Sequence, residues 1–415
     1  MNEPAADSRA AFRYPDFRRY LLARFLTTLS SEMQSVAVGW QMYSITHRPL
    51  DLGLAGLAQF LPAVCLFLIT GHVSDRVPRK RILLACSLGF SICSALLLAF
   101  ALNHISTVYP IYAVLLMNGT VRAFNAPAAQ SFLPLILPRS VFPNGVTWNS
   151  SAFQVSTIAG PMVGGILYGV TGSPIWVYGT AMLAYLAGAW ALSRVKPASR
   201  EPKQITDMKE NVLAGLRYIW HNKLVLGAMS LDLFAVLLGG AVALLPVYAR
   251  EILKVGAVGL GFMRSAPGLG AVLTSVTIAH WPLRRRAGLA MFWCVFAFGL
   301  FTVIFGLSRN PALSLIMLLL LGGADTISVI VRSTMIQMST PDAMRGRVSA
   351  VNMVFIGASN EVGQFESGVT AEWFGAVPAV VMGGVGTIAI VCLWAWMFKS
   401  LRTLDRLDTI KTESA

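Results

Sequence analysis

Long apolar segments alternate along this chain with short polar connections. About 20 consecutive apolar residues are enough for a helix to span the hydrocarbon core of a membrane. The pattern predicts twelve such helices, centred near residues 33, 62, 92, 118, 156, 183, 236, 268, 297, 322, 360 and 388. The predicted fold class is therefore an all-α membrane protein with twelve transmembrane helices.

One connection is much longer than the others. Residues 194–223 are polar and basic and contain Pro197 and Pro202, a composition typical of a linker between domains. We therefore predict five parts: a cytoplasmic tail at 1–19, a six-helix bundle at 20–193, a cytoplasmic linker at 194–223, a second six-helix bundle at 224–398 and a cytoplasmic tail at 399–415.

The net charge of +14 follows this topology. Of the 33 Lys and Arg residues, 25 lie in the two tails and the even-numbered connections, and four lie in the odd-numbered connections. Basic residues concentrate on the cytoplasmic side of membrane proteins, so both termini are expected in the cytoplasm of a multi-pass inner-membrane protein. The charge indicates contact with lipid headgroups, and nucleic acid is not an expected partner.

Several other classes of protein are not indicated. The five cysteines lie in apolar segments without a C-x-x-C pair, so neither a disulfide framework nor a metal site is expected. Residues 1–20 lack the apolar core of a secretory signal, and we expect the first span to be an uncleaved anchor. Motifs of hydrolases, metalloproteases and ATP-binding proteins are not found. We therefore expect neither an enzyme nor a bound cofactor.

The second half of the chain repeats the first, mainly at Gly and Pro, which mark bends and close helix contacts. At an offset of 205, Pro62 matches Pro267. At an offset of 203 the matches include Gly119 with Gly322, Gly160 with Gly363 and Gly172 with Gly375. The change of offset predicts that the second half is two residues shorter somewhere between Arg286 and Gly322. The repeat as a whole predicts two pseudo-symmetric bundles.

A charged loop separates the second and third predicted helices. Its residues Gly71, Asp75, Arg76, Arg79 and Lys80 resemble the G-x-x-x-D-R-x-G-R-R/K loop of major facilitator superfamily transporters. The resemblance implies a gating loop, with the acid near the cytoplasmic end of helix 11 and the basic residues tying neighbouring helices together.

The charged loop departs from the family pattern at Pro78, where the family usually has Gly. In the second half, His280 and Trp281 replace Asp75 and Arg76, so we expect the two halves to gate differently. The alternative interpretation is a basic anchor loop that fixes topology and has no other role.

Charged residues within the predicted helices indicate functional positions, because each costs roughly 2.5–3.5 kcal/mol on insertion scales. They are Glu32, Arg122, Asp232, Arg264, Asp325, Arg332, Glu361 and Glu366. Desolvation favours the neutral form of a carboxyl group, so the acids are candidates for proton binding. Asp232 ranks below the others, because we expect it to be partly hydrated in the cytoplasmic half of helix 7.

Helical spacing groups these candidates. Glu32 and Tyr43 share one face of the first helix, which we expect to line a central cavity, with Trp40 and Gln41 as further candidates. Asp325 and Arg332 share one face of helix 10, where Ser328 or a water molecule could bridge them.

Arg122 and Asp325 occupy equivalent positions in the two repeats. This predicts an ion pair between the two bundles, which would be either part of the transport mechanism or a purely structural link.

Helix 5 contains Ser156-x-x-x-Gly160-Pro161-x-x-Gly164-Gly165. This segment resembles the antiporter motif of drug/proton exporters, with Ser156 where that motif has Gly. The small residues allow close helix packing and Pro161 bends the helix. The motif implies export, and tight packing alone is the alternative interpretation.

Three further segments complete the resemblance: Val36 to Tyr43, Arg122 to Gln130 and Ser359 to Gly368. Together they resemble the twelve-helix drug/proton antiporter branch that includes enterobactin exporters and macrolide efflux pumps, over residues 12–400. The resemblance implies a secondary transporter that exports a small amphipathic solute, a drug or siderophore-like compound, by proton-coupled alternating access.

Three alternatives to this function remain open. They are a siderophore exporter of narrow specificity, an importer or lysolipid flippase of the same fold, and a non-transporting membrane receptor. The expected partners are the small-molecule substrate, H⁺ and the lipid bilayer, and the protein is expected to be a monomer.

Overall fold

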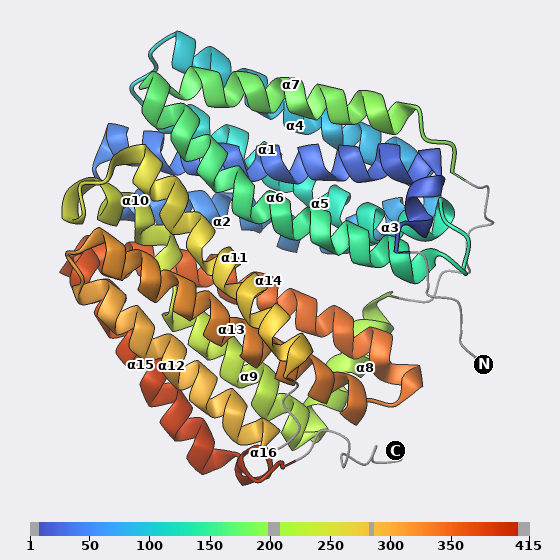
Figure 1. Ribbon diagram of the computed structural model, residues 1–415, viewed down its shortest axis with the longest axis vertical. Helices are drawn as coiled ribbons and strands as arrows, with labels where there is room; N and C mark the ends of the chain where they lie inside the picture. The colour runs from blue at the N-terminus through green and yellow to red at the C-terminus, as the bar shows by residue number, and fades with distance from the viewer. Residues whose placement is uncertain (1–7, 198–207, 282–285, 406–415) are drawn as a thin grey trace. The chain divides into compact units, whose positions relative to one another are not determined.

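The structure is a computed structural model that describes residues 8–197, 208–281 and 286–405. Within these ranges every regular element is a helix (Figure 1), and each of the twelve predicted span centres lies in a helix. Seven of the described helices are long and apolar enough to cross a membrane, and the other predicted spans are shorter or more polar. The all-α membrane fold class is confirmed.

The chain divides into two compact units by its internal contacts. Unit 1 comprises Met1–Thr46 and Ala58–Ile205, and unit 2 comprises His47–Leu57 and Thr206–Ala415. The helices of unit 1 are η1 (Ala10–Arg13), α1 (Pro15–Thr46), α3 (Phe67–Arg76), α4 (Arg79–Leu102), α5 (Tyr109–Gln130), η2 (Leu133–Leu135), α6 (Phe142–Thr171) and α7 (Pro174–Ser193). The helix α2 (Pro49–Cys65) begins in unit 2 and ends in unit 1.

Unit 2 contains the remaining helices, and its first long helix is interrupted at Gly239 and Gly240. The elements are α8 (Met208–His221), α9 (Lys223–Leu238), η3 (Ala241–Leu244), α10 (Leu245–Val247), η4 (Tyr248–Ile252), α11 (Gly256–His280), α12 (Ala287–Leu307), α13 (Pro311–Ser339), α14 (Asp342–Phe374), α15 (Ala376–Met397) and α16 (Lys399–Arg402). The helix α8 lies within the predicted linker and was not expected from the sequence.

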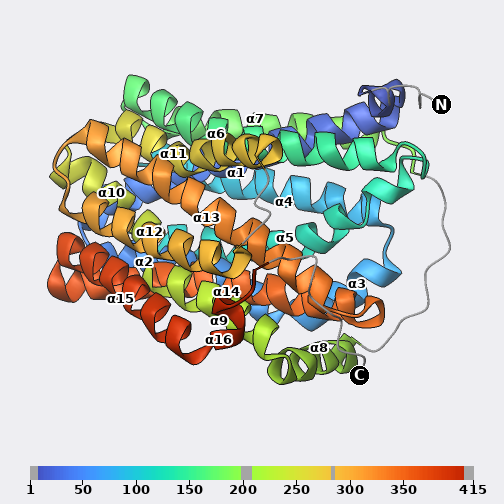
Figure 2. The same ribbon diagram turned by 60° about the horizontal axis from the view of Figure 1, so that its bottom comes forward.

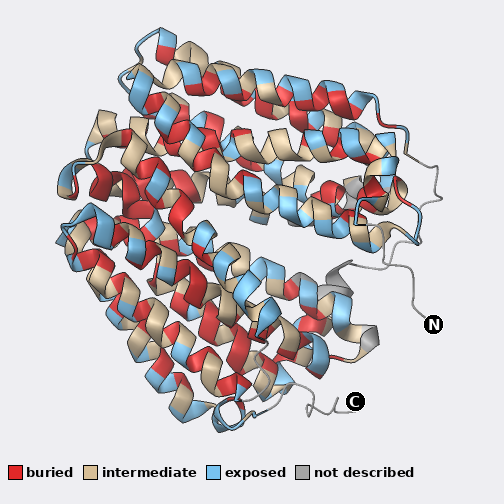
Figure 3. Ribbon diagram, viewed as in Figure 1, coloured by how far each residue is buried: buried red, intermediate tan, exposed pale blue. Residues whose placement is uncertain are grey.

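Large apolar side chains cover the outer surfaces of the helices. Buried and exposed positions alternate along α7 (Figure 3), where Trp176, Leu183 and Trp190 are each about 60% exposed. Such a surface is unfavourable in water but suits contact with lipid, and Trp is enriched at the two membrane interfaces. These exposed residues agree with a membrane-spanning role for α7.

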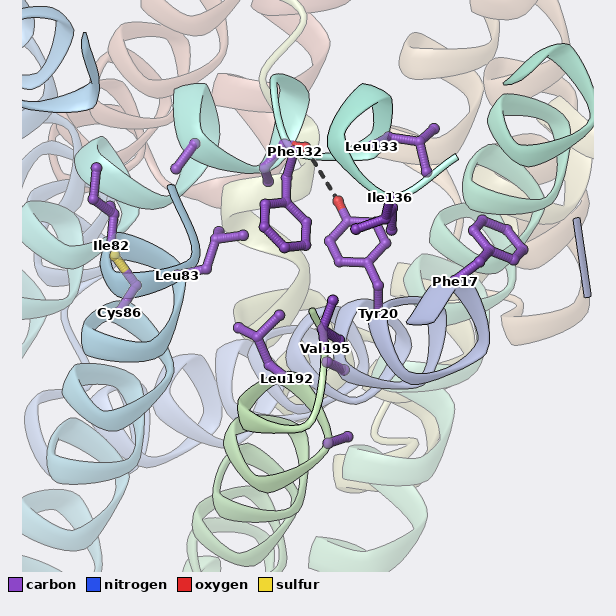
Figure 4. Close-up of a cluster of buried hydrophobic side chains, with 14 of the residues drawn as sticks. Phe17, Tyr20, Ile82, Leu83, Cys86, Phe132, Leu133, Ile136, Leu192 and Val195 are labelled. Carbon is purple, nitrogen blue, oxygen red and sulfur yellow. Dashed lines mark hydrogen bonds between the residues drawn. The ribbon is translucent and has the colours of Figure 1, made fainter. Parts of the chain in front are cut away.

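The start of α1 is anchored in a cluster of buried side chains in unit 1 (Figure 4). Tyr20 packs against Phe132 with ring centroids 5.2 Å apart, and Phe17 is fully buried beside them. The Tyr20 hydroxyl donates a hydrogen bond of 3.1 Å to the Ala129 carbonyl. A buried tyrosine hydroxyl needs such a partner, so this bond fixes α1 against the end of α5.

The internal repeat appears as matching helix contacts in the two units. Gly119 of α5 lies so close to α2 that an added Cβ would overlap the Gln59 carbonyl. Its equivalent, Gly322 of α13, lies equally close to the Pro267 carbonyl of α11. In each unit the close approach of two helix backbones therefore requires glycine at the same repeat position.

Equivalent helices also end and connect in comparable ways. Gly172 and Gly375 follow α6 and α14 with φ values of 66° and 88°, a conformation that favours glycine. The α4–α5 connection runs over residues 103–108, whereas the equivalent α12–α13 connection runs over 308–310. The second half is therefore shorter within the predicted region between Arg286 and Gly322.

Candidate functional site

A buried ion pair joins α9 to α13 in unit 2. The Arg332 guanidinium contacts the Asp232 carboxylate, and the two residues are only 3% and 7% exposed. Their helices pack in an apolar cluster that includes Leu231 and Val331. Because moving an ion out of water costs several kcal/mol even after relaxation, each of these charges depends on the other.

A second carboxylate lies beside this pair. Asp325 precedes Arg332 by two turns of α13 and lines a small cavity together with Asp232 and Ser328. The other lining residues are Ala235, Val236, Val295 and Phe298. The cavity volume is about 10 Å³, which is roughly enough to hold one water molecule.

We call Asp232, Asp325 and Arg332 the acid–arginine cluster. It contains two acids and one guanidinium, so with both acids ionised it carries one uncompensated negative charge. A proton or another cation at the cavity would neutralise it. Apart from the two acids, the side chains that line the cavity are the Ser328 hydroxyl and several apolar groups, and none of them carries a positive charge.

The structure corrects the prediction for Asp232. From the sequence, this residue is expected to be partly hydrated and ranks below the other acids, whereas in the structure it is buried and paired with Arg332. That expectation was wrong because distance from the membrane surface, judged along the chain, does not measure burial among helices. One signal was present: Asp232 is the sole charged residue between Lys223 and Arg250, and such an acid needs a partner.

Glu32 lies where α1 packs against α6. An added Cβ at Gly160 would be 2.5 Å from the Glu32 Cβ, and one at Gly164 would be 2.7 Å from the Met33 carbonyl. The Ser156 hydroxyl continues this contact by donating a 3.2 Å hydrogen bond to the Phe25 carbonyl. The small residues spaced by four on α6 thus form the surface on which α1 rests. Pro161 and Gly165 are buried in the same helix.

The other candidates on α1 contact neighbouring helices of unit 1. The Tyr178 hydroxyl donates a hydrogen bond of 2.6 Å to the Gln41 side chain. Trp40 meets Tyr168 edge to face, with centroids 6.4 Å apart, and Tyr43 is 2% exposed. That these residues contact substrate stays a prediction.

Two residues of the charged loop tie α4 to its neighbours in unit 1. Arg79 Nε donates to the Ser131 hydroxyl at 2.9 Å, after the end of α5. Lys80 Nζ donates to the Ser193 carbonyl at 2.7 Å, at the end of α7, where a cation is favoured by the helix dipole. Gly71 is buried and Arg76 is exposed, and the side chain of Asp75 lies outside the described ones.

The two candidate acids of α14, Glu361 and Glu366, have local partners. Gln364 donates to Glu361 at 3.4 Å, and Thr370 donates to Glu366 at 2.8 Å. For the described residues, no group of three or more His, Cys, Asp or Glu is placed to hold a metal ion. The predicted Arg122–Asp325 pair would join unit 1 to unit 2 and stays a prediction.

A contact between the start of α2 and α14, both in unit 2, was not predicted from the sequence. Arg48 Nε donates to Glu372 at 3.0 Å, and an added Cβ on Gly53 would be 3.1 Å from the Phe365 backbone. The sequence pattern places Arg48 in an odd-numbered connection and Glu372 outside the set of intramembrane acids.

We expect Gly53→Val to destabilise the protein more than Arg48→Ala does. The valine side chain would push α2 from the α14 backbone at a cost of about 1–3 kcal/mol. The side chains of Arg48 and Glu372 are 56% and 26% exposed, and such pairs contribute about 0–1 kcal/mol. Thermal unfolding of the purified variants measures which of the two is less stable. Equal stability, or a lower stability of Arg48→Ala, would contradict the packing described here.

Comparisons with known proteins cover nearly the whole chain. A family model described as transmembrane secretion effector matches residues 6–414. The enterobactin exporters EntS of Shigella boydii serotype 18 and Escherichia coli O81 are each 26% identical over 386 residues, covering 90% of this chain and 86% of the relative.

Solved structures share the fold. The nucleoside transporter NupG superposes with a TM-score of 0.71 at 14% identity, over 92% of this chain and 99% of that one. A D-xylose-proton symporter superposes with a TM-score of 0.69 at 13% identity, over 95% and 98% of the two chains. At these identities the likeness concerns the arrangement of helices and not the solute.

Proposed function

Because the chain belongs to the transmembrane secretion effector family of the major facilitator superfamily, we propose that it is a secondary transporter exporting a siderophore-like organic solute. The enterobactin exporters among its relatives support the direction and the class of solute. The distribution of Lys and Arg supports an inner-membrane location with both termini in the cytoplasm.

The acid–arginine cluster is the observation that carries the proposed energy source. Arg332 balances the charge of one acid, so the remaining negative charge faces the small cavity lined by Asp232, Asp325 and Ser328. An uncompensated charge in a membrane span is expensive, and proton binding there removes it. We assign the exchangeable proton to Asp325, since Asp232 is the acid in contact with Arg332.

Exchange of solute for protons requires that the transporter does not bind the solute and the proton at the same time. Protonation would make the acid–arginine cluster neutral, and deprotonation would restore its negative charge. In this proposal the two charge states favour different conformations of the transporter, so the proton gradient drives solute outward. A conformational equilibrium can be shifted only by a ligand that binds its states with different affinity, and the proton is that ligand here.

Transport into inside-out vesicles tests the proposed function. With an acidic lumen, vesicles containing the protein should accumulate enterobactin, and collapse of the pH gradient by a protonophore should stop this accumulation. Vesicles from the same cells without the protein are the control.

Other outcomes of this assay would redirect or contradict the proposal. Similar uptake of many unrelated amphipathic drugs would indicate a multidrug exporter, and solute efflux from such vesicles would indicate an importer. A failure to move any siderophore or drug under any imposed pH or sodium gradient would contradict a transport function and favour the receptor alternative.

A further inference from the structure

The helix α8 ends one residue before α9, the first membrane-spanning helix of unit 2. Its side chains are described from Ala214 onward. It is held on one side by α14, beside which it lies in both ribbon views (Figure 1, Figure 2), and it contacts the end of α13 at Ser339. An added Cβ on Gly215 would be 2.9 Å from the Arg347 carbonyl. The Tyr218 hydroxyl donates a 2.6 Å hydrogen bond to the Ser339 carbonyl.

The docked side of α8 is also apolar. Ile219 is 2% exposed and belongs to a cluster with Val225, Met229, Ile336, Val348 and Val351. Gly215 and Ile219 are four residues apart, so both point in one direction from the helix. This contact fixes the rotation of α8 about its axis and therefore decides what the remaining side chains face.

Two different flanks remain outside this contact. At 100° per residue, from about 3.6 residues per turn, Leu216 and Trp220 fall on one flank and Arg217 and His221 fall on the other. Trp220 is 74% exposed and Leu216 is 38% exposed, while Arg217 and His221 are exposed as well. An apolar flank beside a basic flank is the pattern of a helix that lies in a membrane interface.

We propose that α8 contacts the cytoplasmic leaflet of the membrane, with Leu216 and Trp220 at the boundary of the acyl chains. Arg217 and His221 then face the headgroups of anionic phospholipids. Three observations favour this occupant: α8 is separated from a spanning helix only by Asn222, the aromatic residue of its apolar flank is Trp, which is enriched at membrane interfaces, and its polar flank is basic. The proposal does not depend on which solute is transported.

A protein partner fits this surface less well. A stable protein interface buries about 800 Å² on each partner, whereas the outward apolar flank described here consists of Leu216 and Trp220. A bilayer needs no such area on one helix, because the neighbouring spans hold the protein in it.

Site-specific fluorescence in the full-length protein tests the lipid contact. A bimane label is placed at Trp220→Cys, or at Arg217→Cys as the matched site on the basic flank. In both variants Cys65, Cys294 and Cys392 are replaced by Ser, while Cys86 and Cys93 are buried and remain. Each protein is reconstituted in nanodiscs of phosphatidylcholine with or without phosphatidylglycerol.

The label at 220 should be quenched more strongly from the lipid, and the label at 217 more strongly from the aqueous phase. Lipids carrying a nitroxide on the upper part of the acyl chain should quench the label at 220 about twofold more than the label at 217, and aqueous iodide should give the reverse order. Phosphatidylglycerol should strengthen the quenching by lipid at 220, and Arg217→Gln with His221→Gln should abolish that gain.

Three results would overturn the proposal. Equal quenching of both labels by iodide would mean that α8 faces water. Protection of the label at 220 from both quenchers would mean that protein covers the flank. Insensitivity of the lipid quenching to phosphatidylglycerol would remove the role of anionic headgroups.

Discussion

Replacing Arg332 by Ala should strongly destabilise the protein, because it leaves the Asp232 carboxylate buried without its partner. Removing one member of a buried ion pair costs about 3–5 kcal/mol. For a bundle of this size we expect a fall in melting temperature on the order of 10 °C, together with a lower yield of folded protein. Thermal unfolding in detergent, followed by size-exclusion chromatography, measures both effects.

Two further variants make this prediction specific. Arg402→Ala removes the same side chain from an exposed position on α16 and should change stability by no more than about 0.5 kcal/mol. The double variant Asp232→Asn with Arg332→Gln removes both charges of the ion pair and should recover most of the lost stability, since neither member is left buried without its partner. If Arg332→Ala unfolds at the wild-type temperature, the two charges are not mutually dependent as described.

Replacing Asp325 by Asn should abolish transport driven by a pH gradient and preserve the fold. The amide has nearly the same size as the carboxyl group but binds no exchangeable proton at this site, so the acid–arginine cluster keeps a constant charge. We expect gradient-driven accumulation of the solute to fall about 100-fold or more, because losing a positioned proton-transfer group typically costs about 10²–10⁴-fold. Uptake into inside-out vesicles with an acidic lumen measures this loss.

Exchange of labelled for unlabelled solute separates coupling from binding. This exchange requires no net proton movement, so Asp325→Asn should retain it. Thr326→Val is the matched control: Thr326 is the next residue of α13, and its hydroxyl donates to the Gly322 carbonyl at 2.8 Å, away from the residues that line the cavity. Normal gradient-driven uptake by Asp325→Asn would exclude Asp325 as the coupling group, while loss of exchange as well would place it in solute binding.

Much of the candidate site could be anticipated from single helices. Asp325 and Arg332 fall on one face of α13 because their spacing is two helical turns, and the small residues of Ser156–Gly165 predicted a close helix contact in advance. The partner of Arg332 could not be anticipated in this way. Asp232 lies 100 residues earlier, and many rotations of α9 would satisfy its apolar sequence.

The same limit applies to α8 and to the start of α2. The sequence of α8 lies in a polar, basic stretch with two prolines upstream, so composition favoured a linker. Its helix is stabilised by the contact of Gly215, Tyr218 and Ile219 with α13 and α14, and packing of this kind contributes most of the stability of short helices. Arg48 and Glu372 are 324 residues apart, a separation at which no periodicity relates two positions.

The sequence by itself determined that the chain is a polytopic membrane protein built from a duplicated set of helices. These properties follow from the length of apolar segments, from charge asymmetry and from glycines at a nearly constant offset, all of which are local or periodic. Only the tertiary structure decided that Arg332 balances Asp232 and leaves Asp325 at the cavity. The physical reason is that burial and ion pairing depend on the rotation and spacing of whole helices, which the packing of their side chains sets.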